Sequence, residues 1–426
     1  MPLSVKASFT ILVIGMFLLC PFGGTPFLQA AEKSGEFDAH ASSYRYFFQD
    51  EDMDFHFGNL VLGASVNRGC SVGEAFYAAS KIKDGDAKTW HKAWFDLAEL
   101  VQARGERALA KGHDISARSQ FLRAAYYYRI SSLAMNPMDS RFLERGQKCR
   151  RLMKKLGPLF DPPLEYIEIP FEDTVIPGYF RAANHDGSSA KTLIMIGGGE
   201  TYIEDLYFYL ARQAYERGCN FLTVDLPGQG LMPVEGKVFR TDTYIPMKSV
   251  VDYALSRPET DPDGIAAYGI SGGGLFVPQA AMHDKRIKAI AMNSAVTDAY
   301  TLFKTMPAVT ADEKEMNSWT SFHRGIVEAI CLRYGVEKPA DLAKANQGNT
   351  FDPEKIDAPA LIIVGQGEYQ SKAVQEQQKY ALDNFPNPKK KMVVTPTAEG
   401  ATNHCVMENR DLVGQVLFDW LDEVLE

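Results

Sequence analysis

One serine of the chain lies in a sequence context that is typical of a catalytic nucleophile. Ser271 is in the stretch "YGISGGG", which matches the pattern G-x-S-x-G. An apolar run over 264–271 precedes the turn and an apolar segment follows it, so the serine is expected between a buried strand and a helix. The flanking glycines tolerate the strained backbone of such a turn. The N–H of Gly272 is then placed to stabilise a developing oxyanion.

A serine hydroxyl is a weak nucleophile and needs a general base. His404 is the candidate, because "EGATNHCV" follows the last predicted strand and precedes the final helix. A loop there can reach the strand ends at which the serine lies. His283 is expected on the surface of the helix after the serine, and His323 is expected as a solvated side chain of a helical insertion. The sequence therefore predicts that His404 accepts the proton of Ser271.

The base needs a carboxylate that orients it. Glu368, in "LIIVGQGEYQS", lies just beyond the strand that precedes the histidine strand. The chain order is then serine, acid, histidine, as in a known class of such sites. Asp is more usual than Glu at this place, and Asp298, after the preceding strand, is the alternative acid.

The glycine-rich stretch "IGGGETYIED" follows the first parallel strand. Its backbone N–H groups can approach a ligand closely, so it is expected to supply the second oxyanion donor, near Gly199 or Glu200. The stretch lacks the Lys-Ser/Thr of a phosphate loop. A carboxylate at Glu200 is costly beside an oxyanion unless it binds something, which makes it a candidate accessory residue. The alternative is a carboxylate that stabilises the start of a helix.

Short apolar runs after residue 164 are typical of strands that are buried on both faces, as in a parallel sheet. Helical segments separate most of them, which indicates an α/β sheet with crossover connections. Two earlier runs, "LEYIEIPF" and "VIPGYFRAA", predict an opening hairpin. The segment from about 297 to 357 is longer than an ordinary connection and is interpreted as an inserted helical cap. The runs are 192–198, 220–228, 264–271, 287–295, 360–367 and 390–397.

The first part of the chain has two predicted regions. Residues 1–31 combine a charged start, a short apolar core and a small-residue exit, which is the pattern of a cleaved secretory signal. This predicts a secreted or periplasmic protein with no stable membrane span after cleavage; the alternative is an uncleaved membrane anchor. Residues 40–156 show apolar residues at helical spacing and predict a helical domain. The glycine and prolines of "LGPLFDPP" mark the boundary to the catalytic domain over 164–426.

Composition excludes several classes of function. The net charge of −9 argues against a nucleic-acid partner, because phosphate binding needs an excess of Lys and Arg. The six cysteines form no C-x-x-C pair and the histidines are dispersed, so no metal site and no cofactor are expected. The expected partner is a small-molecule substrate. Disulfide pairing does not follow from the spacing.

Together these motifs resemble the α/β-hydrolase superfamily over residues 164–426. The helical part, with "FGNLVLGASVNRGCSVGEAFYAASKIKDGD" and "GHDISARSQFLRAAYYYR", is similar to one branch of it. That branch includes 2,6-dihydroxypseudooxynicotine hydrolase, a fungal pigment polyketide-shortening hydrolase and FrsA-like esterases. The resemblance implies a helical domain that roofs the active site, the triad Ser271, Glu368 and His404, and a homodimer as in many branch members. The branch also has a Glu after its Gly-Gly loop that assists carbon–carbon cleavage, and Glu200 lies in the equivalent loop.

The sequence therefore predicts an exported serine hydrolase that cleaves an ester or related acyl bond. The resemblance adds a second possible reaction, the cleavage of a C–C bond in a β-diketone. One alternative is an acylaminoacyl-type peptidase, although such enzymes usually carry a β-propeller and no repeated blades are present. The other is a non-catalytic interaction protein, because some helices are similar to tetratricopeptide helices. The sequence contains no repeat of about 34 residues, which disfavours that alternative.

Overall fold

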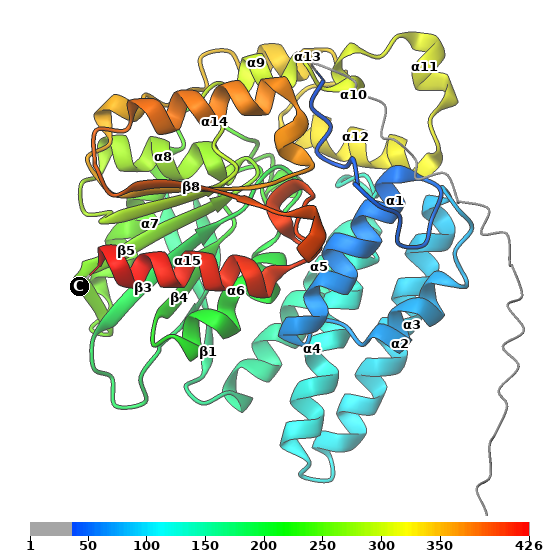
Figure 1. The fold of residues 1–426 in the computed structure, drawn as a ribbon. Coiled ribbons are helices and arrows are strands. Elements are labelled where there is room, and N and C mark those ends of the chain that lie inside the picture. The colour runs from blue at the N-terminus through cyan, green and yellow to red at the C-terminus, as the bar shows by residue number, and fades with distance from the viewer. Residues whose placement is uncertain (1–35, 426) are drawn as a thin grey trace, which may run out of the picture. The chain divides into compact units, whose positions relative to one another are not determined.

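The computed structural model describes residues 36–425, which belong to one compact unit. An eight-stranded sheet runs through it in the order β1-β2-β4-β3-β5-β6-β7-β8 (Figure 1). The pairs from β4 to β8 are parallel, whereas β1 and β2 form the antiparallel hairpin that the sequence predicts. The predicted mostly parallel α/β sheet is therefore confirmed. The strands are β1 (Leu164–Phe171), β2 (Thr174–Arg181), β3 (Ala190–Ile196), β4 (Asn220–Val224), β5 (Thr260–Ile270), β6 (Ala289–Asn293), β7 (Ala360–Gly365) and β8 (Lys390–Thr395).

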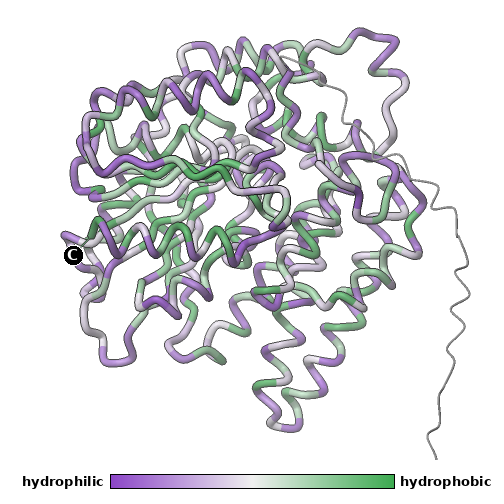
Figure 2. The backbone as a smooth tube through the Cα atoms, viewed as in Figure 1, coloured by the Kyte–Doolittle hydropathy of each residue, from purple (hydrophilic) through white to green (hydrophobic). Residues whose placement is uncertain are grey.

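Helices cover both faces of the sheet, and the central strands consist mostly of hydrophobic residues, as the green tube in Figure 2 shows. Successive strand residues point to opposite faces, so Leu193 belongs to one core and Ile194 to the other. Helices α6 and α15 pack into the first core, and α7, α8 and α14 pack into the second (Figure 1). Their bounds are α6 (Ile203–Glu216), α7 (Tyr244–Ser256), α8 (Gly273–His283), α14 (Lys372–Asn384) and α15 (Arg410–Val424).

Helices before the sheet share the first core with it. Trp90 and Trp94, at the helical spacing seen in the sequence, are fully buried in the same cluster as Leu417 of α15. A shared core fixes the helical part against the sheet, because separating them exposes aromatic surface to water. The elements are α1 (Glu51–Phe55), a π-helix η1 (His56–Leu62), a 3₁₀ helix η2 (Gly63–Asn67), α2 (Val72–Ala79), α3 (Ala87–Leu109), α4 (Asp114–Ile130) and α5 (Ser140–Leu156).

The segment interpreted as a cap contains short helices between β6 and β7. They lie beside the N-terminal residues 36–50, here called the strap, at the edge of the sheet where the parallel strands end (Figure 1). The backbone N–H of Phe37 in the strap donates to the carbonyl of Thr305 in the cap. The helices are α9 (Ala299–Phe303), α10 (Pro307–Thr310), α11 (Glu313–Ser318), α12 (Ser321–Arg333) and α13 (Asp341–Ala345).

The predicted secretory signal, residues 1–31, lies outside the described residues. Within residues 36–425, no helix combines the length and hydropathy that a membrane crossing requires. All five cysteines of this part are buried and unpaired.

A buried arginine joins the helical part to the helices that cover one face of the sheet. The Arg410 guanidinium is fully buried and donates to the carbonyls of Asn59, Leu60, Met407 and Phe208. We expect Arg410→Met to lower the free energy of unfolding by ~3 kcal/mol or more, because it leaves several buried carbonyls without donors. Urea unfolding midpoints measure this. Arg107→Met, at an exposed position of α3, is the matched control and is expected to change the midpoint little.

Candidate active site

Ser271 lies at the turn between β5 and α8, as the sequence predicts. Its φ is +53°, in the left-handed region that side-chain-bearing residues rarely adopt. The Ser271 N–H donates to the carbonyl of Asn293 (2.8 Å), and the Ser271 carbonyl accepts from the Gly274 N–H (2.8 Å). These bonds hold the strained residue, which is a common feature of functional turns.

The glycines around Ser271 are required by close packing. A Cβ atom on Gly269 would overlap the carbonyl of Gly273, and a Cβ on Gly273 would overlap the carbonyl of Ile196. A Cβ on Gly274 would overlap the carbonyl of Ser294 in the same way. The glycines thus let α8 begin directly against β3 and the end of β6, with Gly272 as its N-cap.

His404 and Glu368, far apart in sequence, meet beside the serine turn. His404 Nδ1 lies 2.9 Å from Glu368 Oε1, and the hydroxyl of Ser294 donates to the same oxygen (2.8 Å). Glu368 is buried and His404 is half-buried, with side-chain exposures of 2% and 11%. His404 Nε2 has no hydrogen-bond partner within the described part of the chain. The carboxylate therefore accepts the Nδ1 proton and leaves Nε2 as the free basic atom.

Asn293 connects the loop of His404 to the turn of Ser271. Its carbonyl accepts from the Ser271 N–H and also from the Cys405 thiol, whose Sγ lies 3.3 Å away. Its side-chain amide donates to the Cys405 carbonyl (2.9 Å) and to the Tyr268 hydroxyl (3.2 Å). Because one residue at the end of β6 bonds both segments, the positions of His404 and Ser271 are coupled.

The environment of His404 sets the pH range in which it can act as a base. Burial lowers the pKa of His404, but the Cys405 sulfur and the Glu368 carboxylate raise it more, so the pKa lies well above the ordinary 6.5. The imidazolium form cannot accept a proton. We therefore expect kcat/KM to fall as pH decreases through this raised pKa, with the acid limb above pH 6.5.

Glu368→Gln is expected to move that acid limb to lower pH, because the amide no longer stabilises the imidazolium, and to lower the rate. Asp298→Asn is the matched control, because the Asp298 carboxylate caps α9 by accepting from Thr301. Its pH profile should match the wild type. If the pH profile shifted in Asp298→Asn and stayed unchanged in Glu368→Gln, Asp298 rather than Glu368 would be the acid that orients His404.

The glycine-rich loop lies directly against the serine. A Cβ on Gly198 would lie 2.6 Å from Ser271 Oγ and 2.6 Å from the Gly272 nitrogen, whereas a Cβ on Gly199 would meet open space. Gln229 and the Thr201 hydroxyl both donate to the Gly198 carbonyl. The N–H of Gly199 points away from these donors, because N–H and C=O of a trans peptide are opposed. Gly199 also lines the cavity next to Ser271 and Gly272.

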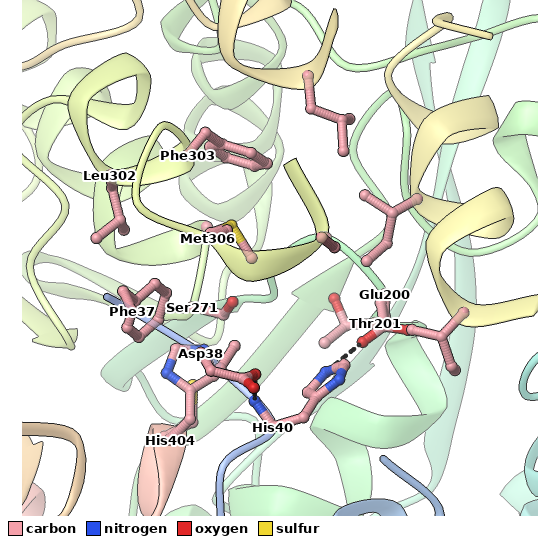
Figure 3. A pocket seen from close by; sticks show the side chains of 18 of the residues that line it. Phe37, Asp38, His40, Glu200, Thr201, Ser271, Leu302, Phe303, Met306 and His404 are labelled. Carbon is pink, nitrogen blue, oxygen red and sulfur yellow. Dashed lines mark hydrogen bonds and ion pairs between the residues drawn. The ribbon is translucent and has the colours of Figure 1, made fainter. Parts of the chain in front are cut away.

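Ser271, His404 and Gly199 line one cavity of about 190 Å³. At roughly 10–15 Å³ for one water, this is room for on the order of a dozen waters, enough for a small organic molecule. Figure 3 shows Ser271 and His404 on one side, the apolar cap residues above them, and His40 and Glu200 on the other side. The apolar lining from α8 and the cap includes Leu275, Phe276, Leu302, Phe303, Met306, Ile326 and Val327.

Glu200, the candidate accessory residue, belongs to a polar cluster that faces Ser271 across this cavity, and the sequence did not reveal its partners His40 and Asp52. His40 Nε2 lies 3.0 Å from Glu200 Oε2, and His40 Nδ1 lies 2.5 Å from Asp52 Oδ1. Burial lowers the pKa of His40, but the two carboxylates raise it well above its ordinary value. Asp52 and Glu200 are therefore held as carboxylates, with pKa values below the usual range. Glu200 is thus bound by a histidine rather than left exposed at a helix start.

Two other histidines differ in their relation to the cavity. His323 was expected to be solvated, but its Nδ1 contacts Asp52 Oδ2 and it lines the cavity; the expectation was wrong because α12 packs against α1. His283 stacks on Tyr244 at the end of α8 and does not line the cavity. No sequence pattern marks His40, Asp52 or His56, because neither the strap nor the first helices, α1 and η1, have a periodicity that relates them to a cavity.

Comparison with known proteins places the chain in a family. The model of the FrsA-like esterases matches residues 84–314, which is more than half of the chain. The chain belongs to the FrsA-like esterase family. A second model, that of the C-terminal part of BAAT and acyl-CoA thioester hydrolases, matches residues 247–399 of this FrsA-like chain. The FrsA-like protein is therefore a hydrolase with the α/β-hydrolase fold, as its sequence predicts.

Individual relatives agree with this assignment. The 20-hydroxy-prefusarin hydrolase FUS2 of Gibberella moniliformis is 31% identical, over 74% of this chain and 82% of its own length. Hydrolase LUC6 of a Fusarium species is 26% identical, over 88% of this chain and 97% of its own. The crystal structure of 2,6-dihydroxy-pseudo-oxynicotine hydrolase shares the fold, with a TM-score of 0.69 at 22% identity, covering 85% of this chain and 95% of that one.

Proposed function

We propose that this FrsA-like hydrolase is a serine esterase in which Ser271 is the nucleophile and His404 the general base. The observation that carries the proposal is the His404–Glu368 pair, which leaves Nε2 unpartnered in the cavity that Ser271 lines. Glu368 orients the imidazole and stabilises its charged form. The N–H groups of Gly272 and Gly199 stabilise the oxyanion.

The reaction follows from these positions. Ser271 Oγ bonds to the substrate carbonyl carbon while His404 Nε2 accepts its proton, and the negative charge moves to the carbonyl oxygen. The bond to the leaving alkoxide breaks as His404 returns the proton to it. His404 then takes a proton from water, whose oxygen attacks the acyl carbon. As the bond from the acyl carbon to Ser271 Oγ breaks, His404 returns this proton to Oγ and the carboxylic acid leaves.

The cavity favours a substrate with an apolar body and two oxygen functions. The cap and α8 supply apolar walls, such as Leu302 and Phe276, that suit an alkyl or polyketide-like chain. His40 and Glu200 provide a polar group across the cavity from Ser271 (Figure 3). We propose that this polar group binds a second substrate oxygen, on a carbonyl close to the bond that is cleaved.

This polar group favours a second candidate reaction, the cleavage of a β-diketone C–C bond. The serine adds to one carbonyl and the C–C bond breaks to release an enolate. The enolate carbon accepts the proton that His404 carries, and water hydrolyses the acyl-serine. Because His40 and Glu200 line the same cavity as Ser271, we propose that they bind the enolate oxygen. Glu200→Gln is then expected to lower diketone cleavage more than ester hydrolysis.

Fluorophosphonate labelling with mass-spectrometric mapping tests the proposal. We expect one adduct on Ser271, which is lost in Ser271→Ala and strongly slowed in His404→Ala. The type of bond that the enzyme cleaves is then identified by comparing the turnover of three substrates: a short p-nitrophenyl ester, a 1,3-diketone and an aminoacyl-naphthylamide. Faster turnover of the naphthylamide than of the esters would favour a peptidase, and labelling of another residue would contradict the assignment of Ser271.

We also propose that the protein is exported, on the basis of the charged and apolar pattern of residues 1–31. The supporting result is a mature N-terminus near Ala30 or Ala31 in intact-mass measurement of the purified protein. A full-length mass in the membrane fraction would favour the uncleaved anchor.

A further inference from the structure

We propose that His40, His56 and Glu200 form a binding site for a divalent transition-metal ion of the zinc class, open to the cavity that holds Ser271. The ligand atoms of the three residues all lie within 4.8 Å of one another. Glu200 Oε2 is 3.0 Å from His40 Nε2 and 3.7 Å from His56 Nε2. Tetrahedral ligands at about 2.0–2.1 Å from zinc stand roughly 3.4 Å apart, so small shifts of the side chains suffice.

Asp52 orients both histidines as ligands, and an ion that binds Nε2 of His40 displaces the proton that this nitrogen shares with Glu200. Its Oδ1 accepts from Nδ1 of His40 (2.5 Å), and its backbone carbonyl accepts from Nδ1 of His56 (2.6 Å). A carbonyl only accepts, so Nδ1 of His56 carries a proton, and Nε2 is the ring nitrogen left to bind an ion. Histidines that bind metals in proteins donate their other ring N–H to a carboxylate or a backbone carbonyl in this way. The hydrogen bonds to Nδ1 thus orient the two histidines as in known metal sites, which a His–Glu ion pair alone would not require.

The backbone around the site has a second unusual feature. His56 is the first residue of the π-helix η1, directly after α1, and its side chain is 1% exposed. π-Helices are rare and occur frequently at functional sites. The ring of His40 lies against the rings of Phe55 and His56, at centroid distances of 4.8 and 4.7 Å. These contacts hold the imidazoles in place before an ion binds.

The donor set determines the class of ion. Two imidazole nitrogens and one carboxylate suit Zn²⁺, Co²⁺ or Ni²⁺, whereas Ca²⁺ and Mg²⁺ prefer sites made of oxygen atoms. Three protein ligands leave a fourth position, and His40 and Glu200 both line the cavity, so that position is open to a water or a substrate oxygen. The ion would supply a Lewis acid across the cavity from Ser271 (Figure 3).

The test uses the purified full-length protein, treated with a chelator and then dialysed against Zn²⁺ or Co²⁺. We expect one ion per chain by plasma mass spectrometry and a tetrahedral Co²⁺ absorption spectrum. His40→Asn, His56→Asn and Glu200→Gln should each weaken binding by about 100-fold or more, and Asp52→Asn by about 10–100-fold, because it orients the ligands. His185→Asn is the matched control, because His185 forms an exposed ion pair with Asp161. This variant should bind the metal ion as tightly as the wild type.

Absence of a stoichiometric ion in the wild type, or equal loss in His185→Asn, would overturn the proposal. If a ligand variant does not fold, X-ray absorption of the zinc-loaded wild type decides, because it must show two imidazoles and an oxygen donor. Fluorophosphonate labelling of the metal-free protein tests the serine mechanism independently of the metal site. Labelled Ser271 without metal binding contradicts only the metal site, and metal binding without labelling contradicts only the serine mechanism.

Discussion

Ser271→Ala is expected to lower kcat for ester hydrolysis by about 10⁴-fold or more, because the acyl-enzyme can no longer form. His404→Ala should cost about as much, since nucleophile and base act as one unit and their effects do not add. The double variant is therefore expected to be no slower than either single variant. Steady-state kinetics on a short p-nitrophenyl ester measure these rates.

The serine prediction has a simple control. Ser189→Ala changes an exposed serine between β2 and β3 and should leave kcat unchanged. Alanine at 271 keeps the Cβ atom and the strained φ, so the urea unfolding midpoint should stay near the wild type. An alanine variant that folds normally and retains more than a tenth of the activity would remove Ser271 from the mechanism.

Gly198→Ala is expected to lower kcat by about 10²–10³-fold, the loss that follows from removing one oxyanion donor. The added methyl would lie 2.6 Å from Ser271 Oγ and 2.6 Å from the Gly272 nitrogen. The loop must then shift away from the serine, and the N–H of Gly199 moves with it. The measurement is kcat together with the rate of fluorophosphonate labelling, which should fall in parallel.

Gly199→Ala is the control for this loop. A Cβ at Gly199 meets no atom within 4 Å and the N–H is kept, so we expect kcat within a few-fold of the wild type. Comparable losses in both variants would show that the loop tolerates no substitution at all, and would contradict a specific contact of Gly198 with the oxyanion site. Normal activity in Gly198→Ala would contradict the proposed oxyanion loop altogether.

The sequence by itself determined the sheet and the order of the site residues. Strands buried on both faces appear as continuous apolar runs, so β3 to β7 could be located without a structure. The turn at Ser271 was evident because a strand, a G-x-S-x-G pattern and a helix occur together, and each is a local signal. Parallel strands end at one edge of the sheet, so Glu368 and His404, in loops after β7 and β8, were expected near Ser271. The structure places Glu368 and His404 in contact.

Only the tertiary structure decided what lies opposite the serine. His40, Asp52 and His56 come from the strap and the first helices, more than 140 residues before Glu200, and no periodicity relates them to the cavity. The same holds for Asn293, whose contacts with Ser271 and Cys405 depend on how β6 ends beside β5. The sequence indicated the glycine loop near Gly199, whereas only the structure shows that a Cβ atom at Gly198 would overlap Ser271. Local patterns encode strands and turns, but contacts between distant side chains arise only when the elements pack together.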